Sequence, residues 1–386
     1  MKNKWRIAWM LIMALFLVSS VTGWASGASP LEQVLAQVPQ EAFDTGFFSY
    51  ADLKGLTALV PGVALPAEGQ MAEDYLRSDS GSAFIRAMSG VSAGYGELIQ
   101  TLFQLDMVKD ATGLSVLKVE QTAEVGKQPQ RLVVLRGGFD TQAVQQALAA
   151  KGYQASTEQQ GLWCPDGDCA LGAKVDLAGR DPGFLFGGLL GARWPVYFGK
   201  GVLMASPSEG AIRAASQRRP NLLEDEVVSA AVTAIGEDLG QVHQLLLLDP
   251  AKVLDGTRAG SSWSGIGMLA MAQVDGADAQ RVVITISYDD GAQAEAARAA
   301  LDVGVPDVVL AGGQPLPFLV EDLGGEWEDA SVTQTGTGAV LRIPLRFPEQ
   351  REALAADGRM SPGLPFSFFT KMVIQLDLHW LAELGS

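Results

Sequence analysis

The stretch RLVVLRGGFDTQAVQQALAAKG, residues 131–152, predicts a strand followed by a helix. Its first six residues are apolar and β-branched enough for a buried strand. Asp140 is a candidate N-cap, and Gly152 is a candidate for the residue just after the helix. Between these two, apolar residues recur at the spacing of one helix face, at Ala143, Val144, Ala147 and Leu148.

A second stretch, RVVITISYDDGAQAEAARAALDVG at residues 281–304, shows the same order of features with an offset of 150. Six of the twenty positions from 131 to 150 are identical in the two stretches. A further pair of segments, 31–53 and 228–250, both predict helix, turn, apolar strand and then Asp, with an offset of 197 at Asp52 and Asp249. The two offsets differ by 47, which indicates an insertion at about 60–107 in the first half.

The order of elements favours an α+β fold, with two related repeats, largely antiparallel sheets and packed helices. We expect a first repeat over 29–220 and a second over 221–386, with the boundary at Arg218-Arg219-Pro220. Each predicted repeat also contains later strands. In the first repeat they form a hairpin at 196–205, and in the second they flank residues 335–338. The remaining local predictions are an edge strand or bulge at Pro344, a half-buried strand over 374–380, and an amphipathic helix presenting Tyr95, Leu98, Ile99, Leu102 and Phe103.

The N-terminal segment 1–28 is typical of a secretory signal peptide. Three cations precede an apolar run of twelve residues, Ile7 to Val18, and small residues follow it. That run is shorter than the roughly 20 residues of a membrane-spanning helix. We expect cleavage somewhere in 25–28 and a periplasmic or secreted protein; the alternative is an uncleaved signal that anchors the chain.

The protein is acidic, with 28 Lys and Arg against 44 Asp and Glu, a formal net charge of −16. Loss of the three cations of the signal leaves 25 against 44, or −19. A field of this sign repels nucleic acid and anionic lipid headgroups, so we exclude nucleic acid as a partner. About 358 residues remain after cleavage, more than one hydrophobic core usually serves.

Three short motifs resemble an uncharacterised family of exported bacterial proteins, a domain of unknown function. They are Val38-Pro39 followed by 47–52 (FFSYAD), Gly138-Phe139-Asp140 leading to Gly152-Tyr153, and 202–206 (VLMAS). The resemblance covers roughly residues 31–220. It implies export and an α+β fold, and it brings no catalytic residues with it.

Residues 90–94 match G-x-S-x-G, the motif that presents the nucleophile of α/β-hydrolases on a turn between strand and helix. Ser92 is therefore a weak catalytic candidate, with His379 as a weak candidate for its base. The residues before the motif do not form an apolar strand run, which favours Ser92 as a cap or loop residue. His243 lies beside the apolar run QLLLLD and is predicted to be a packed or edge-strand residue.

Asp166 and Asp168 are weak candidates for a calcium site, together with Asp176 and Asp181. The full spacing of a calcium loop is missing, and a turn explains the same residues. We expect no metal and no cofactor. Two His and two Cys argue against zinc, and Gly265-Ile266-Gly267 opens an apolar β segment rather than a dinucleotide-binding helix. A catalytic carboxylate pair is left open, because such a pairing is spatial.

Cys164 and Cys169 are the two cysteines of the chain, and we expect them to form a structural disulfide. The intervening Pro-Asp-Gly-Asp favours a chain reversal that brings the two Cα atoms into bonding range. The leading hypothesis for function is a non-catalytic binding or structural module at the cell envelope, with an unidentified envelope protein or ligand as partner. The alternative is an extracytoplasmic hydrolase that uses Ser92 or a carboxylate pair.

Overall fold

The computed structural model describes residues 28–66, 72–101, 104–217, 219–236, 239–253, 263, 265–276, 278–303, 315–336, 338–348, 361–375 and 381. Residues 1–27 of the predicted signal and His379 lie outside the described residues. No helix in the described part of the chain is both long and apolar enough to span a bilayer.

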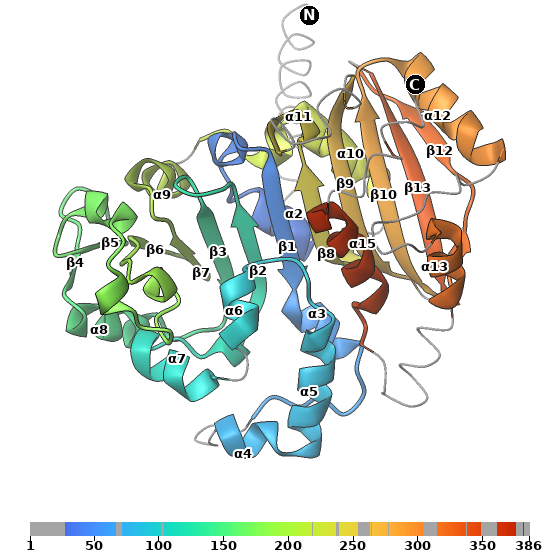
Figure 1. The fold of residues 1–386 in the computed structure, drawn as a ribbon. Coiled ribbons are helices and arrows are strands. Elements are labelled where there is room, and N and C mark those ends of the chain that lie inside the picture. The colour runs from blue at the N-terminus through green and yellow to red at the C-terminus, as the bar shows by residue number, and fades with distance from the viewer. Residues whose placement is uncertain are drawn as a thin grey trace, which may run out of the picture.

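The described strands form one 13-stranded sheet in which every pairing is antiparallel, so the class is α+β (Figure 1). Along the sheet the order is β11-β13-β10-β9-β8-β1-β2-β3-β7-β6-β5-β4, and β12 also pairs with β13. The strands of the first half are β1 (Phe47–Asp52), β2 (Val119–Val125), β3 (Leu132–Gly137), β4 (Tyr153–Ala155), β5 (Leu162–Pro165), β6 (Val196–Gly199) and β7 (Val202–Ala205). Those of the second half are β8 (Val242–Leu248), β9 (Ile266–Asp275), β10 (Gln280–Tyr288), β11 (Glu326–Trp327), β12 (Ser331–Gln334) and β13 (Ala339–Phe347).

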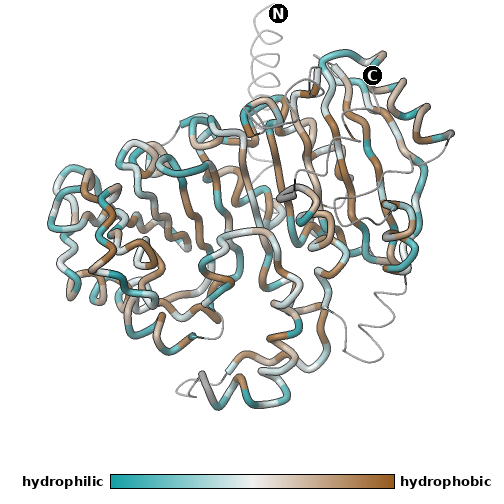
Figure 2. Tube along the Cα trace, in the orientation of Figure 1, coloured by the Kyte–Doolittle hydropathy of each residue, from teal (hydrophilic) through white to brown (hydrophobic). Residues whose placement is uncertain are grey.

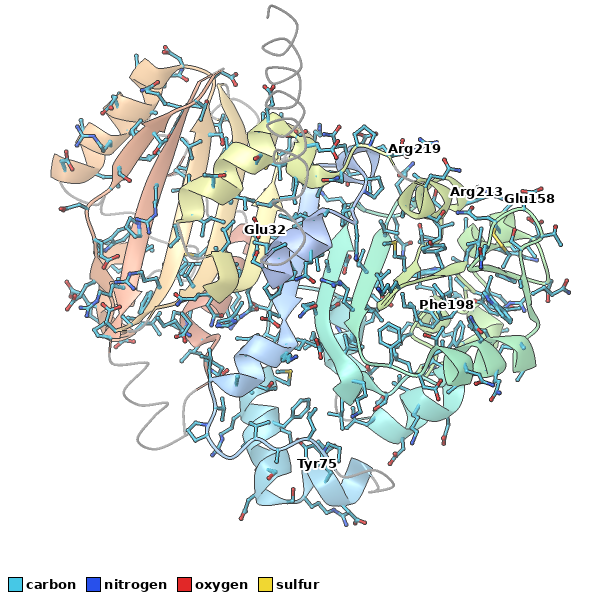
Figure 3. All side chains as sticks on the ribbon, turned by 180° about the vertical axis from the view of Figure 1, so that it is seen from behind. Glu32, Tyr75, Glu158, Phe198, Arg213 and Arg219 are labelled. Atoms are coloured by element: carbon cyan, nitrogen blue, oxygen red, sulfur yellow. A yellow bond between two sulfur atoms is a disulfide. The ribbon has the colours of Figure 1, made fainter. Side chains whose placement is uncertain are left out.

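Three helices cover one side of the sheet, which we call the α2/α10 face: α2 (Pro30–Leu35), α9 (Glu209–Ser216) and α10 (Glu226–Ile235). Figure 3 shows α2 and α10 lying across this face. Their apolar side chains form one core with alternate residues of the strands, among them Leu245 and Leu247. The alternation follows from the period of two in a strand, which sends successive side chains to opposite faces.

The opposite side, the α3/α15 face, carries two cores, one for each half of the chain. In the first half it is covered by α3 (Leu53–Ala58), α4 (Ala72–Leu76), α5 (Asp79–Ser89), α6 (Gly96–Gln100), α7 (Leu105–Thr112) and α8 (Thr141–Ala150). In the second half it is covered by α11 (Pro250–Val253), α12 (Gly291–Val303), α13 (Leu316–Asp322) and α15 (Leu364–Gln375). β8, which packs against cores on both faces, is apolar from Leu245 to Leu248, and Figure 2 shows mainly apolar residues in the strands there.

The two halves of the chain meet where β1 pairs with β8 in the middle of the sheet. In that pairing Ser49 lies opposite Leu246. From this pair outward, the first half runs β1, β2, β3, β7 and the second half runs β8, β9, β10, β13. The sheet is therefore continuous across the expected boundary near residue 220.

The predicted strand–helix units are confirmed in both halves. β3 and β10 form where the two apolar runs predicted strands, and α8 and α12 follow them. Asp140 caps α8 by accepting hydrogen bonds from the backbone N–H groups of Gln142 and Ala143, and Gly152, with φ of +84°, follows the helix C-cap. The hairpin at 196–205 is also confirmed, as β6 paired with β7.

The 150-residue offset, however, does not match the register of the sheet. In the first half, Ser49 pairs with β2 at a residue that in turn pairs with Val133 of β3. In the second half, its partner Leu246 leads in the same way through β9 to Ile284 of β10. Structurally equivalent residues of β3 and β10 are therefore 151 positions apart, not 150. Val133 packs on the α3/α15 face, whereas Val283 packs on the α2/α10 face. A shift of one residue turns a strand's side chains to the other face of the sheet. Residues that are aligned by the sequence offset of 150 therefore do not occupy equivalent positions in the two halves.

The strand predicted over 374–380 is wrong at its first two residues, which are the ones the structure describes. Ile374 belongs to α15, not to a strand, and 376–380 lie outside the described residues. The physical reason is the spacing of three in Phe366, Phe369 and Met372, which places all three on one helix face against the core of the second half.

The helix predicted around residues 95–103 is α6, which covers Gly96–Gln100, and the predicted Leu102 and Phe103 lie outside the described residues. Tyr95 precedes α6 as its N-cap with an extended backbone, and its backbone N–H donates to the Thr122 hydroxyl on β2. Thr101 ends the helix as its C-cap. The segment is held to the sheet by that long-range bond, which periodicity does not reveal.

Pro344 lies neither in an edge strand nor at a bulge of the β10–β13 pairing. β13 is paired along one side with β10, with a continuous register through Pro344 opposite Val283. Along its other side, β12 pairs with residues up to Arg342 and β11 pairs from Leu345 onward. Pro344 thus falls in the gap between two short strands, where no ladder hydrogen bond from its nitrogen is needed.

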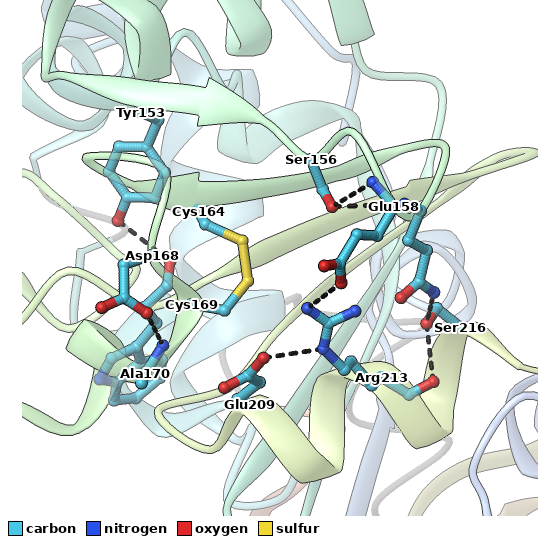
Figure 4. The surroundings of a disulfide bond; sticks show 12 residues. Tyr153, Ser156, Glu158, Cys164, Asp168, Cys169, Ala170, Glu209, Arg213 and Ser216 are labelled. Carbon is cyan, nitrogen blue, oxygen red and sulfur yellow. Dashed lines mark hydrogen bonds and ion pairs between the residues drawn. A yellow bond between two sulfur atoms is a disulfide. The ribbon is translucent and has the colours of Figure 1, made fainter.

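The predicted disulfide is confirmed: Cys164 of β5 is bonded to Cys169, and their Cα atoms are 4.6 Å apart (Figure 4). Asp166 (φ +50°) and Gly167 (φ +82°) make the turn between them. Both cysteines are buried in the core on the α2/α10 face, beside the ion pairs of Arg213. A bonded pair is compatible with an extracytoplasmic protein.

Replacing both Cys164 and Cys169 by Ala is expected to lower the free energy of unfolding by about 2 kcal/mol, because a bridge across six residues removes little entropy from the unfolded chain. Urea unfolding of the double variant measures this loss. Mass spectrometry of the exported protein, alkylated without reductant, should find neither cysteine modified. Two modified cysteines would show that the bridge does not form.

Candidate functional site

Ser92 lies in the loop between α5 and α6, on the α3/α15 face, and not on a turn after a strand. The backbone N–H groups of Ser92 and Ala93 both donate to the side-chain oxygen of Gln244 in β8, at 2.8 and 3.1 Å. The Ser92 hydroxyl lies 2.9 Å from the hydroxyl of Thr370 in α15. The motif therefore attaches a loop to the sheet, and the described residues place a threonine, not an imidazole, against its serine.

Gln244 is the centre of a buried polar network that the sequence analysis missed. Its side-chain nitrogen donates to the carbonyl oxygen of Gly90 at 3.1 Å and to the side-chain oxygen of Gln273 at 2.7 Å. Gln273 in turn donates to the carbonyl oxygen of Pro362, just before α15. Both glutamines are fully buried. Two glutamines inside the apolar strands β8 and β9 were the available signal, since a buried amide requires partners.

His243 is buried, as predicted for a packed residue, but β8 is a central strand rather than an edge. Its Nδ1 lies 3.8 Å from the Asp52 carboxylate and has no hydrogen-bond partner among the described residues. The other oxygen of Asp52 accepts from the backbone N–H of Gly55 and so caps α3. These contacts hold the start of α3 against β8 and do not bring His243 to Ser92.

The candidate calcium ligands have other partners. Asp166 forms a bidentate ion pair with the guanidinium of Arg193, which lowers the pKa of that carboxyl. Asp168 accepts a hydrogen bond from the backbone N–H of Ala170 and caps the 3-10 turn Cys169–Ala173. Within the described ranges there is no group of three or more His, Cys, Asp and Glu side chains that could hold a metal ion.

A pair of carboxylates does come together, around Arg131 at the start of β3. The Arg131 guanidinium donates to Glu97 at 2.9 Å and to Glu124 at 2.7 Å. It lies over two aromatic rings, 5.1 Å from the centroid of Tyr95 and 5.4 Å from that of Trp194. Contacts of this kind, with a guanidinium over ring faces, are attractive.

Burial determines the electrostatics of this cluster. It raises the pKa of Glu124, and the hydrogen bond from Arg131 opposes part of that rise. Burial by itself lowers the pKa of Arg131, but the hydrogen bond and charge of Glu124 raise it overall. One guanidinium compensates only one of the two negative charges, but both carboxylates are bound to it, so the arrangement does not present a free acid and a free base to a substrate.

A groove of about 870 Å³ lies on the α2/α10 face of the second half. Its walls are α10, the end of β10 and the β12–β13 hairpin, and most of its lining is apolar or small. Residues that contribute are Val227, Ala230, Ala234, Ser287, Thr333 and Val340. Small-molecule sites of proteins are commonly concave, mostly apolar and of roughly 300–1,000 Å³, so the groove has the size and character of a binding site.

The groove also has polar side chains in its lining, among them Ser229, Thr233, Thr333, Gln334 and Thr335. Glu226, the first residue of α10, and Asp289, just after β10, are exposed at its rim. Ser287 is 8% exposed, and its hydroxyl has no hydrogen-bond partner in the described part of the chain. Buried hydroxyls without partners are uncommon in folded proteins, so the Ser287 hydroxyl lacks the hydrogen bond that a buried polar group normally makes.

Two smaller cavities lie in the first half. One, of about 540 Å³, lies between the end of α2, the β6–β7 hairpin and α9, on the same face as the groove. The other, of about 250 Å³, lies between α3, α5 and the start of β2. The first has mainly polar surroundings, with Arg219 held by Glu41, and the second is small.

No protein-family model matches this chain, and no curated protein does either. The chain is weakly similar to crystal structures of TP0453. Crystal forms III and I each give a TM-score of 0.32 at 9% identity, covering 86% of this chain and 100% and 99% of that chain. Crystal form IV gives a TM-score of 0.33 at 8% identity, covering 82% of this chain and 96% of that one. Similarity at this level carries no functional argument.

Proposed function

We propose that the chain is an exported, non-catalytic protein that binds a ligand or partner at the cell envelope, and that the groove beside α10 is its binding site. The observation that carries the proposal is a groove of about 870 Å³ with a buried, unpartnered hydroxyl of Ser287 in its lining. The signal-like N-terminus and the disulfide support export. We also propose membership in the uncharacterised exported family that the chain resembles.

We further propose that residues 29–220 and 221–386 are repeats of one α+β unit. The order of elements supports this: in each half a helix precedes three consecutive antiparallel strands, a helix follows them, and a hairpin then adds its last strand beside the third. Between β1 and β2 the first half has α3 to α7, which supports the proposed insertion at about 60–107. The one-residue difference in register implies that the two copies have diverged by a local insertion or deletion.

The alternative, a hydrolase that uses Ser92 or a carboxylate pair, has less support. The Ser92 hydroxyl contacts Thr370, and both carboxylates of the Glu97 and Glu124 pair are bound to Arg131. A fluorophosphonate probe tests this alternative directly. Covalent labelling of the exported protein that is lost in Ser92→Ala would overturn the non-catalytic proposal.

Binding in the groove is tested with N-phenyl-1-naphthylamine, a neutral apolar fluorophore. The wild-type protein is expected to bind it saturably, and Ala230→Trp is expected to weaken binding at least about tenfold, because the indole fills space beside the half-buried Ala230. Fluorescence titration measures both dissociation constants. Thermal melts check that the variant is folded.

The matched control is Ala149→Trp, which makes the same substitution at an exposed position of α8 on the other face of the sheet. It should leave the dissociation constant unchanged. If wild type binds no probe, or if Ala230→Trp binds as tightly as wild type, the groove is not the binding site.

A further inference from the structure

The charge of the groove indicates what kind of ligand it takes, if the proposed binding function holds. Its rim carries the carboxylates of Glu226 and Asp289, and its described lining includes no Lys or Arg. Neither carboxylate has an ion-pair partner within the described ranges. Two uncompensated carboxylates beside a low-dielectric wall attract a cation and repel an anion.

The nearby cation and helix end do not reverse this preference. Arg342 lies on β13, and its Nε donates to the carbonyl oxygen of Ile235 at the far end of α10. At the near end, the side chain of Asp225 accepts from the backbone N–H groups of Val227 and Val228. The positive end of α10 is thereby already matched by a carboxylate, as helix N-termini commonly are.

The carboxylate of Asp289 lies next to apolar surface. A Cβ atom built on Gly267 would be 3.7 Å from the Asp289 carboxylate and 3.8 Å from a methyl carbon of Val227. A negative oxygen and a methyl group thus both lie next to the space over Gly267. A ligand that fits both must combine a positive group with an apolar body.

The Ser287 hydroxyl supplies an independent polar contact. Two residues earlier on the same strand, the Thr285 hydroxyl donates to the carbonyl oxygen of Ala231 in α10. Because side chains two apart on a strand point to the same face, Ser287 also faces the groove side of the sheet. Its hydroxyl lacks the partner that Thr285 has, and it lines the groove.

We propose that the groove binds an amphipathic amine: an organic cation whose ammonium lies between the Glu226 and Asp289 carboxylates, whose apolar body lies along α10, and which hydrogen-bonds to Ser287. The site uses no covalent step. The small side chains Ala230 and Ala234 leave room for the apolar body, and the acidic rim selects its charge.

The test compares two dansyl probes of matched size on the full mature chain. Dansylcadaverine carries an ammonium, and dansyl-6-aminohexanoate carries a carboxylate. In low salt, dansylcadaverine is expected to bind about tenfold tighter, and the preference should shrink in 0.5 M NaCl because salt screens exposed charges. Fluorescence titration gives both dissociation constants.

Single variants then assign the contacts. Glu226→Gln and Asp289→Asn should each weaken dansylcadaverine about threefold, and the double variant should remove the preference for the amine. Ser287→Ala should weaken it about fivefold, with a melting temperature that is unchanged or raised, since it removes an unpartnered buried hydroxyl. The control Asp110→Asn, at an exposed position of α7 on the opposite face, should change nothing.

The outcomes separate the two proposals. If N-phenyl-1-naphthylamine binds and Ala230→Trp blocks it, but both dansyl probes bind equally, the groove is a binding site and the amine inference is wrong. If dansylcadaverine binds to Ala230→Trp as it does to wild type, its site is elsewhere and the inference is also wrong. If the neutral probe does not bind at all, the proposed function fails first.

Discussion

Replacing Gln244 by Ala is expected to lower the free energy of unfolding by about 3–5 kcal/mol. The substitution leaves the backbone N–H groups of Ser92 and Ala93, the carbonyl oxygen of Gly90 and the side-chain oxygen of Gln273 without their partner. Each unsatisfied buried group costs about 1–3 kcal/mol, and relaxation or entry of water offsets part of the sum. Urea unfolding measures the change.

The control for this prediction is Gln146→Ala, which removes the same amide from an exposed position of α8. It should leave the free energy of unfolding unchanged within error. Gln273→Ala should have an intermediate effect, since the described partners of the Gln273 side chain are Gln244 and the carbonyl oxygen of Pro362. A Gln244→Ala protein as stable as Gln146→Ala would show that the network does not hold the loop to the sheet.

Replacing Arg131 by Met is expected to destabilise the protein by about 3–5 kcal/mol at neutral pH, because removal of one partner leaves buried charges unpaired. Glu97 and Glu124 would lose the guanidinium that they share, and the rings of Tyr95 and Trp194 would lose the cation that both contact. Methionine keeps most of the apolar volume, so the loss reports mainly the charge.

The loss should depend on pH in a defined direction. Burial already raises the pKa of Glu124, and without Arg131 the opposing influence disappears, so that pKa rises further. An acid whose pKa is raised in the folded state lowers the free energy of unfolding when it is charged. This loss of stability is complete above the raised pKa and disappears at a pH where the acid is protonated in both the folded and the unfolded state. The deficit of Arg131→Met should therefore shrink as pH falls from 7 toward 4.5.

Arg298→Met is the matched control, because Arg298 pairs with Glu295 and Asp302 on the exposed surface of α12. It should show no measurable loss and no such dependence on pH. A deficit of Arg131→Met that stays constant from pH 7 to 4.5 would mean that its charge is not what matters at this position.

The G-x-S-x-G stretch illustrates how a short motif misleads. The residues that decide its role are Gln244 and Thr370, which lie 152 and 278 positions away from Ser92. A glycine-flanked serine is suited to a sharp loop, and the sheet beneath it supplies the amide that satisfies the loop's N–H groups. The motif is therefore explained by backbone hydrogen bonding.

Local features of this protein could be predicted from the sequence alone. The strand and helix around 131–150, the cap at Asp140, the hairpin at 196–205 and the bridge between Cys164 and Cys169 all depend on residues within a few positions of one another. Periodicity, capping and turn chemistry act over that range, so the letters themselves carry the information.

Only the tertiary structure decided which of these units meet. The pairing of β1 with β8, the carboxylates gathered on Arg131 and the groove between α10 and the β12–β13 hairpin each join residues far apart in the chain. The register shows the same limit, since an offset that aligned Val133 with Val283 placed them on opposite faces. Such contacts form only when side chains on both faces of the sheet pack at the same time. A short stretch of sequence carries no information about which distant residues it will pack against.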